Sequence, residues 1–265
     1  MDKKYLLVVL PLIVFLGILS MFSWNMDSEV DAEPQKELLV YCGITMIDPM
    51  SEIARIIERQ EGVSISLIKG GSGNLLRSLK LNGVGDLYLP GSESYIKKAK
   101  AEALVTETRH VGYNKAAMMV VKGNPKGISA DLKELQNSAH YVVIGNPDSG
   151  SIGKETKRIL EAAGLYEDVQ LNVRELTTDS KRLTQVLRNN EADLVVNWYA
   201  TSTWPENTPY IDVLPIDEHY AKKKRLVLGL LKSSRYPQIA RRFMEYAASD
   251  KGREIFNRYG LYDVL

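Results

Sequence analysis

Three short segments of small and hydroxyl-bearing residues have the composition of anion-binding turns. They are Cys42-Gly43-Ile44-Thr45, Gly70-Gly71-Ser72-Gly73 and Ser149-Gly150-Ser151. Each follows an apolar run and precedes an amphipathic stretch, so each is predicted to join a strand to a helix. The first N–H groups of a helix lack intrahelical partners and carry partial positive charge, which favours a bound anion. Glycine lets a ligand approach the backbone, and hydroxyl groups add donors.

Cys42 is the single cysteine, so an internal disulfide and a multi-cysteine metal site are excluded. At a strand end beside a helix N-terminus, its thiol pKa is expected to be lowered, and the thiolate would suit a thiophilic ligand such as trivalent arsenic. The alternative is a small buried residue at a strand end. The three histidines, His110, His140 and His219, have no metal-ligand spacing, so no metal site and no cofactor are expected.

The composition is that of an ordinary folded protein. The chain has 265 residues, of which 45% are hydrophobic and 25% charged, which excludes a disordered tail, a collagen-like repeat and a polytopic membrane protein. Lys and Arg number 34 against 33 Asp and Glu, a net charge of +1, so no nucleic-acid partner is indicated. Binding is therefore expected at a local site.

The N-terminus is predicted to be an export segment. Two lysines precede a run from Tyr5 to Trp24 that contains no charged residue. The run is long enough to span a bilayer, which takes about 20 residues, while Val30-Asp31-Ala32 offers a weak cleavage site. Residues 1–35 are therefore either a cleaved signal peptide or a retained anchor. The protein is expected in the periplasm or another extracytoplasmic space, free or anchored to the inner membrane.

From Lys36 onward, short apolar runs alternate with amphipathic stretches, as in an α/β protein with parallel strands. No flexible tether interrupts the alternation, which favours two lobes joined directly. The pattern predicts strands at 38–42, 63–68, 86–89, 116–121, 141–144, 173–176, 192–196, 213–216 and 225–231, and helices at 49–60, 74–81, 95–103, 152–163, 180–189, 237–249 and 251–259.

The ordered set of motifs resembles a known family. LLVYCGITMIDPMSEIARIIERQEGVSISLIKGGSGNLLRSL, GDLYLPGSESYI, NKAAMMVVKGNP, VVIGNPDSGSIGKETKRILEAAGL, ADLVVNWYATS and GREIFNRYGL are similar to segments of molybdate/tungstate-type oxyanion-binding proteins of ABC transporters. These belong to the type II periplasmic binding proteins, with arsenite- and phosphate-sensing relatives. The resemblance covers about residues 38–262. It implies two doubly wound α/β lobes with a ligand cleft between them, one formed by 36–115 and 213–265 and the other by 116–212.

The resemblance also implies roles for individual residues. Ser72 takes the place of the serine that holds the oxyanion, and the backbone donor falls near Ile152, beside Ser151. Trp198 takes the place of the aromatic residue that closes over the ligand, and Gly43 stands where the family usually has a serine. The residues expected to bind ligand are Cys42, Gly43, Thr45, Ser72, Gly73, Ser151, Ile152, Asn197, Trp198 and Tyr199.

The favoured hypothesis is a monomeric binding protein without catalysis, which closes on a small oxyanion such as molybdate, tungstate, phosphate or an arsenic species. Its partner would be an ABC permease or a sensor histidine kinase. One alternative is an exported hydrolase or transferase with Cys42 as nucleophile, which would need a nearby histidine base. Another is an organic-solute-binding protein with a cationic anchor, for which Lys69 and Lys154 flank the turns. The run Lys222–Arg225 is interpreted as a solvated loop, with a docking patch as the alternative.

Overall fold

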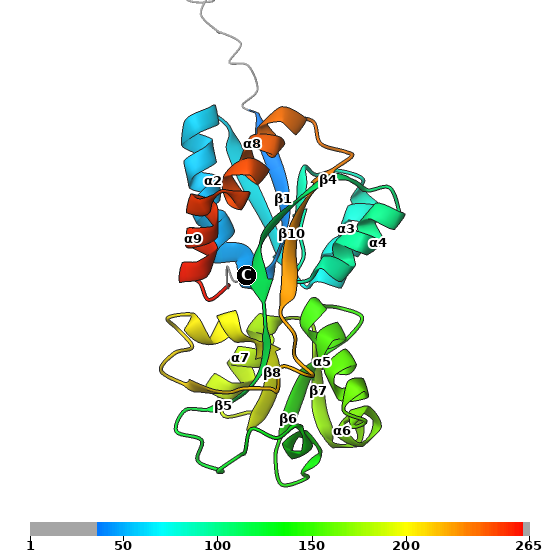
Figure 1. The fold of residues 1–265 in the computed structure, drawn as a ribbon, viewed down its shortest axis with the longest axis vertical. Coiled ribbons are helices and arrows are strands. Elements are labelled where there is room, and N and C mark those ends of the chain that lie inside the picture. The colour runs from blue at the N-terminus through cyan, green and yellow to red at the C-terminus, as the bar shows by residue number, and fades with distance from the viewer. Residues whose placement is uncertain (1–35, 262–265) are drawn as a thin grey trace, which may run out of the picture. The chain divides into compact units, whose positions relative to one another are not determined.

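A computed structural model describes residues 36–261. The predicted export segment, residues 1–35, lies outside this range. Within the range, none of the helices has both the length and the apolar character that a membrane span requires. The strands of residues 36–261 are arranged in two five-stranded sheets, each with helices on both faces (Figure 1).

The first sheet has the strand order β2-β1-β3-β10-β4. β1 runs parallel to β2 and β3, whereas β10 is antiparallel to β3 and β4. The strands are β1 (Glu37–Gly43), β2 (Ser64–Gly70), β3 (Leu87–Leu89), β4 (Val105–Asn114) and β10 (Lys224–Leu231).

Alternation along β1 divides the first lobe into two cores. Leu38, Val40 and Cys42 pack toward one face, and Tyr41 packs toward the other, as the two-residue period of a strand requires. The first face carries α2 (Ile47–Glu61), α8 (Pro237–Ala248) and α9 (Asp250–Arg258), and the second carries α3 (Ser72–Asn82) and α4 (Glu93–Ala101) (Figure 1).

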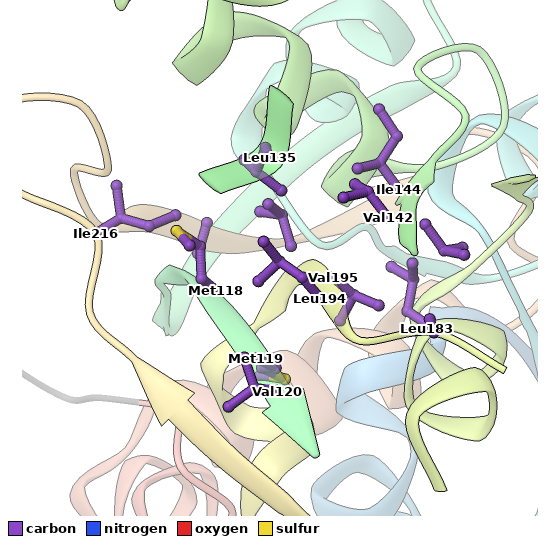
Figure 2. Close-up of a cluster of buried hydrophobic side chains, with 14 of the residues drawn as sticks. Met118, Met119, Val120, Leu135, Val142, Ile144, Leu183, Leu194, Val195 and Ile216 are labelled. Carbon is purple, nitrogen blue, oxygen red and sulfur yellow. The ribbon is translucent and has the colours of Figure 1, made fainter. Parts of the chain in front are cut away.

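The second sheet has the order β7-β6-β8-β5-β9. Its central strands bury apolar side chains such as Met118, Val142, Leu194 and Val195, which lie together in the core of this lobe (Figure 2). The elements of this lobe are β5 (Ala116–Val121), η2 (Leu132–Gln136), β6 (Val142–Gly145), α5 (Ser151–Ala162), α6 (Tyr166–Asn172), β7 (Val173–Thr177), α7 (Ser180–Arg188), β8 (Leu194–Trp198), η3 (Tyr199–Thr203) and β9 (Ile211–Leu214).

The predicted fold class of two α/β lobes is confirmed, with small differences at the crossing points. The chain passes from β4 to β5 at Lys115 and returns through residues 215–223 to β10. Val213 and Leu214 pair with β5, so the second sheet extends to residue 214 rather than to the expected boundary at 212.

The structure differs from the local predictions at β4, at α6 and at the start of α2. The strand β4 was not predicted, because its sequence VTETRHVGYN mixes charged and apolar residues; it is an edge strand paired only with β10. The short helix α6 was not predicted either. The helix α2 begins at Ile47, directly after a short 3₁₀ turn (η1, Ile44–Met46), rather than at the predicted residue 49. Its predicted end is confirmed, since Gly62 takes the left-handed conformation (φ 64°) that terminates helices.

Candidate functional site

The three predicted turns meet at a small cavity between the lobes, here called the interlobe cavity. Its empty volume is about 220 Å³. The turns lie at the carboxyl ends of β1, β2 and, through a short loop, β6, where ligands bind in doubly wound sheets. The lining residues from the first lobe are Gly43, Ile44, Thr45, Gly70, Gly71, Ser72 and Gly91, and those from the second are Gly150, Ser151, Ile152, Asp179 and Ser180.

Five of the residues expected to bind ligand line this cavity, namely Gly43, Thr45, Ser72, Ser151 and Ile152. The hydroxyl-bearing members are buried, with exposed fractions of 3% for Thr45, 2% for Ser72 and 6% for Ser151. Buried hydroxyl groups require hydrogen-bond partners. The three hydroxyl groups come from both lobes, so a guest in the cavity would be contacted from two sides.

Ser72 is held in place by two hydrogen bonds. The backbone N–H of Gly91 donates to Ser72 Oγ at 3.0 Å, and the hydroxyl of Tyr88 donates to the Ser72 carbonyl at 2.8 Å. Because Oγ accepts from Gly91, the hydroxyl proton of Ser72 is free to be donated to a guest.

The side chains of Trp198 and Asn197 pack behind the residues that line the interlobe cavity. Trp198 Nε1 donates to Ser151 Oγ at 3.3 Å, and the Trp198 side chain is only 1% exposed. Asn197 Nδ2 donates to the Ser180 carbonyl at 2.9 Å, and Asn197 Oδ1 accepts from the Trp198 N–H. Tyr199 begins η3, and its N–H donates to the Lys115 carbonyl at 2.8 Å. Asn197 and Trp198 thus position the lining residues Ser180 and Ser151, and none of these three predicted residues lines the cavity itself.

The N-terminus of α3 contacts the opposite lobe. The N–H groups of Gly73 and Asn74 donate to the Ser149 carbonyl at 3.0 and 3.2 Å. Arg77 donates to the Asp148 carbonyl at 3.2 Å. A Cβ atom at Gly71 would lie 2.6 Å from the Ser149 carbonyl oxygen, so only glycine fits there. The lobes are therefore in direct contact on this side of the cavity.

The sequence analysis missed three lining residues, Gly91, Asp179 and Ser180. Asp179 caps α7, since its Oδ1 accepts from the N–H groups of Lys181 and Arg182 at 2.8 and 3.2 Å. In the sequence, Asp179-Ser180 has the pattern of a helix N-cap. Because no glycine is adjacent, this pattern predicts the start of a helix and does not by itself indicate a ligand site. The Asp179 carboxylate is thus satisfied by its own helix.

Cys42 does not line the cavity. It is fully buried on the α2 side of the first sheet, and its Sγ donates to the Gly43 carbonyl at 3.5 Å. Burial, and secondarily the Asp48 carboxylate, raise the pKa of the Cys42 thiol well above its ordinary value. The predicted lowering of this pKa is wrong, because apolar packing outweighs the neighbouring helix. With a protonated thiol and no histidine among the lining residues, the hydrolase alternative lacks support from the described chain.

Within residues 36–261, no group of three or more His, Cys, Asp or Glu side chains could hold a metal ion. His140 lies in the second lobe, where its Nε2 is 3.1 Å from Glu134 Oε2. The cavity also lacks Lys and Arg among its lining residues. Hydroxyl groups and the first N–H groups of α5, at Ser151 and Ile152, are therefore its available donors.

Two curated relatives cover most of the chain. Molybdate-binding protein ModA of Escherichia coli is 20% identical over 84% of this chain and 88% of its own length. The Bacillus subtilis lipoprotein YvgL, provisionally named a substrate-binding protein of an ABC transporter, is 23% identical over 98% of both chains.

Solved structures show the same fold. The periplasmic molybdate-binding protein of Azotobacter vinelandii superposes with a TM-score of 0.70 at 16% identity, covering 86% of this chain and all of its own. The family model for bacterial extracellular solute-binding proteins matches residues 38–262, and this protein belongs to that family.

Proposed function

We propose that this protein binds a small tetrahedral oxyanion of the molybdate type in the interlobe cavity and presents it to the permease of an ABC transporter. The names of the E. coli and B. subtilis relatives support the ligand class and the transport partner respectively. The residues that line the interlobe cavity support the mode of binding, the size of the ligand and the coupling of binding to closure.

The observation that carries the proposal is the set of buried hydroxyl groups around a small cavity. Thr45 and Ser72 come from the first lobe, and Ser151 and Ser180 come from the second. An anion removed from water is costly unless several donors compensate it, and hydrogen bonds to an ionised group are the strong ones. Neutral donors on both lobes provide this compensation only when the lobes are together.

The small size of the cavity and the lack of a cationic side chain in its lining favour an inorganic anion over an organic solute. Its empty volume of about 220 Å³ includes space open to solvent, so the room left for a guest is smaller and suits only a compact one. A carboxylate-bearing organic ligand would be expected to meet an arginine, which binds carboxylates with two hydrogen bonds. No arginine or lysine belongs to the lining of this cavity in residues 36–261.

Binding and lobe closure are coupled in this proposal. A ligand shifts an equilibrium between open and closed forms only through contacts that the closed form alone provides. Ser72 and Ser151 lie on opposite lobes, so an anion that touches both favours the closed form. The permease would then recognise that form.

Isothermal titration calorimetry against molybdate, tungstate, sulfate, phosphate, arsenate and arsenite tests the proposal. We expect one of these anions to bind with 1:1 stoichiometry and Ser72→Ala to weaken binding by about tenfold or more, because a charged-acceptor hydrogen bond is lost. Ser78→Ala, which removes another hydroxyl of α3 that accepts only from Asn82, is the matched control. Absence of heat with all six anions would overturn the proposal.

A further inference from the structure

A second, larger cavity on this protein is lined mainly by cationic side chains. It has an empty volume of about 880 Å³ and lies between α4, α5 and the start of β10. We call it the basic groove. Its charged lining residues are Lys97, Lys154, Arg158, Lys223, Lys224, Arg225, Glu93 and Glu155.

The basic groove concentrates positive charge in a nearly neutral chain. Six cations and two carboxylates give a formal excess of four positive charges, whereas the whole chain carries +1. Part of this charge comes from the run Lys222–Arg225, which the sequence left open between a solvated loop and a docking patch. The structure brings that run beside two helices from different lobes.

The two carboxylates are each shared by two cations. Glu155 contacts Arg158 at 2.6 Å and Lys224 at 3.1 Å. Glu93 is 3.7 Å from Lys97 and 3.6 Å from Arg225. Two carboxylates are too few to balance six cations, and the Glu93 pairs are long, so the basic groove keeps an excess of positive charge that attracts a further anion.

Lys154, in the second lobe, adds positive charge to the basic groove. Its ammonium lies over the Tyr95 ring of α4, 5.5 Å from the ring centre. Burial and the neighbouring Lys98 lower the pKa of Lys154, and Glu155 partly offsets this effect. An incoming anion would relieve the repulsion between these two ammonium groups.

The basic groove adjoins the interlobe cavity at Ser151, which lines both. Gly91 stands on the other side of this boundary, where an added Cβ would lie only 2.2 Å from Ser151 Oγ. Gly91 belongs to the first lobe and Ser151 to the second. A small separation of the lobes would therefore open a passage from the groove to the cavity.

We propose that the basic groove is a docking site at which a small multivalent oxyanion is first held before it passes between Gly91 and Ser151 into the interlobe cavity. This inference rests on the proposed function and adds the route by which the ligand arrives. A cleft lined by charges of one sign raises the local concentration of an oppositely charged ligand and its association rate by about 10- to 1,000-fold. Such an effect weakens with salt, because the Debye length falls from about 30 Å at 0.01 M to about 3 Å at 1 M.

Stopped-flow measurement of molybdate association tests this inference, with tryptophan fluorescence as the signal because Trp198 contacts Ser151. The variant is Lys97→Gln/Lys223→Gln, which removes two charges from the groove. The control is Lys133→Gln/Lys251→Gln, which removes two exposed charges elsewhere, on η2 and α9, and gives the same net charge.

At 10 mM salt we expect the groove variant to associate about 3- to 10-fold more slowly than the unmodified protein, with an unchanged dissociation rate. The control should match the unmodified protein, and all three rates should converge at 500 mM salt. Equal association rates for the groove and control variants would overturn the inference while leaving the proposed function intact. If another of the six anions binds in place of molybdate, that anion replaces molybdate in the stopped-flow experiment. Absence of binding of all six anions to the unmodified protein would overturn both.

Discussion

Replacement of Gly71 by alanine separates lobe closure from the folding of each lobe. Gly71 has φ −67° and ψ 140°, an extended conformation that alanine adopts without strain. Its added Cβ would lie 2.6 Å from the Ser149 carbonyl oxygen and 2.7 Å from that of Thr178. Both carbonyls belong to the second lobe, so the clash exists only when the lobes meet.

The magnitude follows from the contacts that must be given up. Carbon and oxygen atoms in contact are normally more than 3 Å apart, so the lobes must separate here by about 1 Å. The hydrogen bonds of Gly73 and Asn74 to Ser149, now 3.0 and 3.2 Å long, would then exceed hydrogen-bond length. Two such bonds contribute about 1–3 kcal/mol together, so ligand affinity should fall by about 5- to 150-fold.

The assay combines calorimetry with small-angle X-ray scattering. We expect Gly71→Ala to bind molybdate more weakly, to show a smaller ligand-induced decrease in radius of gyration, and to keep the melting temperature of the ligand-free protein. Gly112→Ala is the control, because Gly112 lies in β4 and does not line the cavity, and its Cβ would make only an ordinary contact with the Leu261 carbonyl oxygen of the same lobe, at 3.6 Å.

Two results would refute this reasoning. The first is an unchanged affinity in Gly71→Ala together with a normal decrease in radius of gyration, which would mean that the contact of Gly71 with Ser149 is not part of the bound form. The second is an equal loss of affinity in Gly112→Ala, which would place the effect within the first lobe rather than between the lobes.

Three further predictions concern single side chains. Trp198→Phe removes the donor to Ser151 Oγ while keeping an aromatic ring, so calorimetry should show molybdate affinity reduced by about 3- to 10-fold. Because the folded state raises the pKa of Cys42 above its ordinary value of 9.0, only the unfolded state ionises above about pH 9. Chemical denaturation should therefore show the unfolding free energy falling with pH relative to Cys42→Ala, by up to about 1.4 kcal/mol per pH unit. Hydrogen bonds from Ser129 lower the pKa of Glu134 from 4.5 to about 2. The ionised Glu134 therefore stabilises the folded state above pH 4.5, and this stabilisation is lost as the pH falls toward 2. In thermal melts, the melting temperature of Glu134→Gln should fall less over this pH range than that of the unmodified protein.

The parts of the site that could be predicted are those whose signals are local in sequence. A strand followed by glycine and serine and then by an amphipathic helix identified the turns at Gly43, Ser72 and Ser151, and these meet at one cavity. Gly62 likewise predicts the end of α2, because glycine readily takes the left-handed conformation that terminates a helix. In each case neighbouring residues determine the backbone, so the pattern contains the information.

The parts that could not be predicted depend on contacts between distant segments. Gly91 joins the cavity because its N–H reaches Ser72 Oγ, 19 residues earlier in the chain. Asp179 has an ordinary capping sequence, and only the packing of α7 places it beside the first lobe. For Cys42, the predicted helix that follows it in the sequence favoured a lowered thiol pKa. Burial against α2 instead raises the pKa of this thiol.

The turn at Gly71 also shows why the same sequence signal can serve two purposes. A glycine-serine turn before a helix predicts free N–H groups for an anion, yet the N–H groups of Gly73 and Asn74 in α3 are already bound to the Ser149 carbonyl of the other lobe. While the lobes touch, these amides stabilise closure and are not available to a ligand. The Ser72 hydroxyl therefore becomes the main donor that α3 can offer, because its Oγ accepts from Gly91 and keeps its own proton. Affinity should depend on Ser72 through direct contact and on Gly71 through closure, two effects that calorimetry and scattering together distinguish.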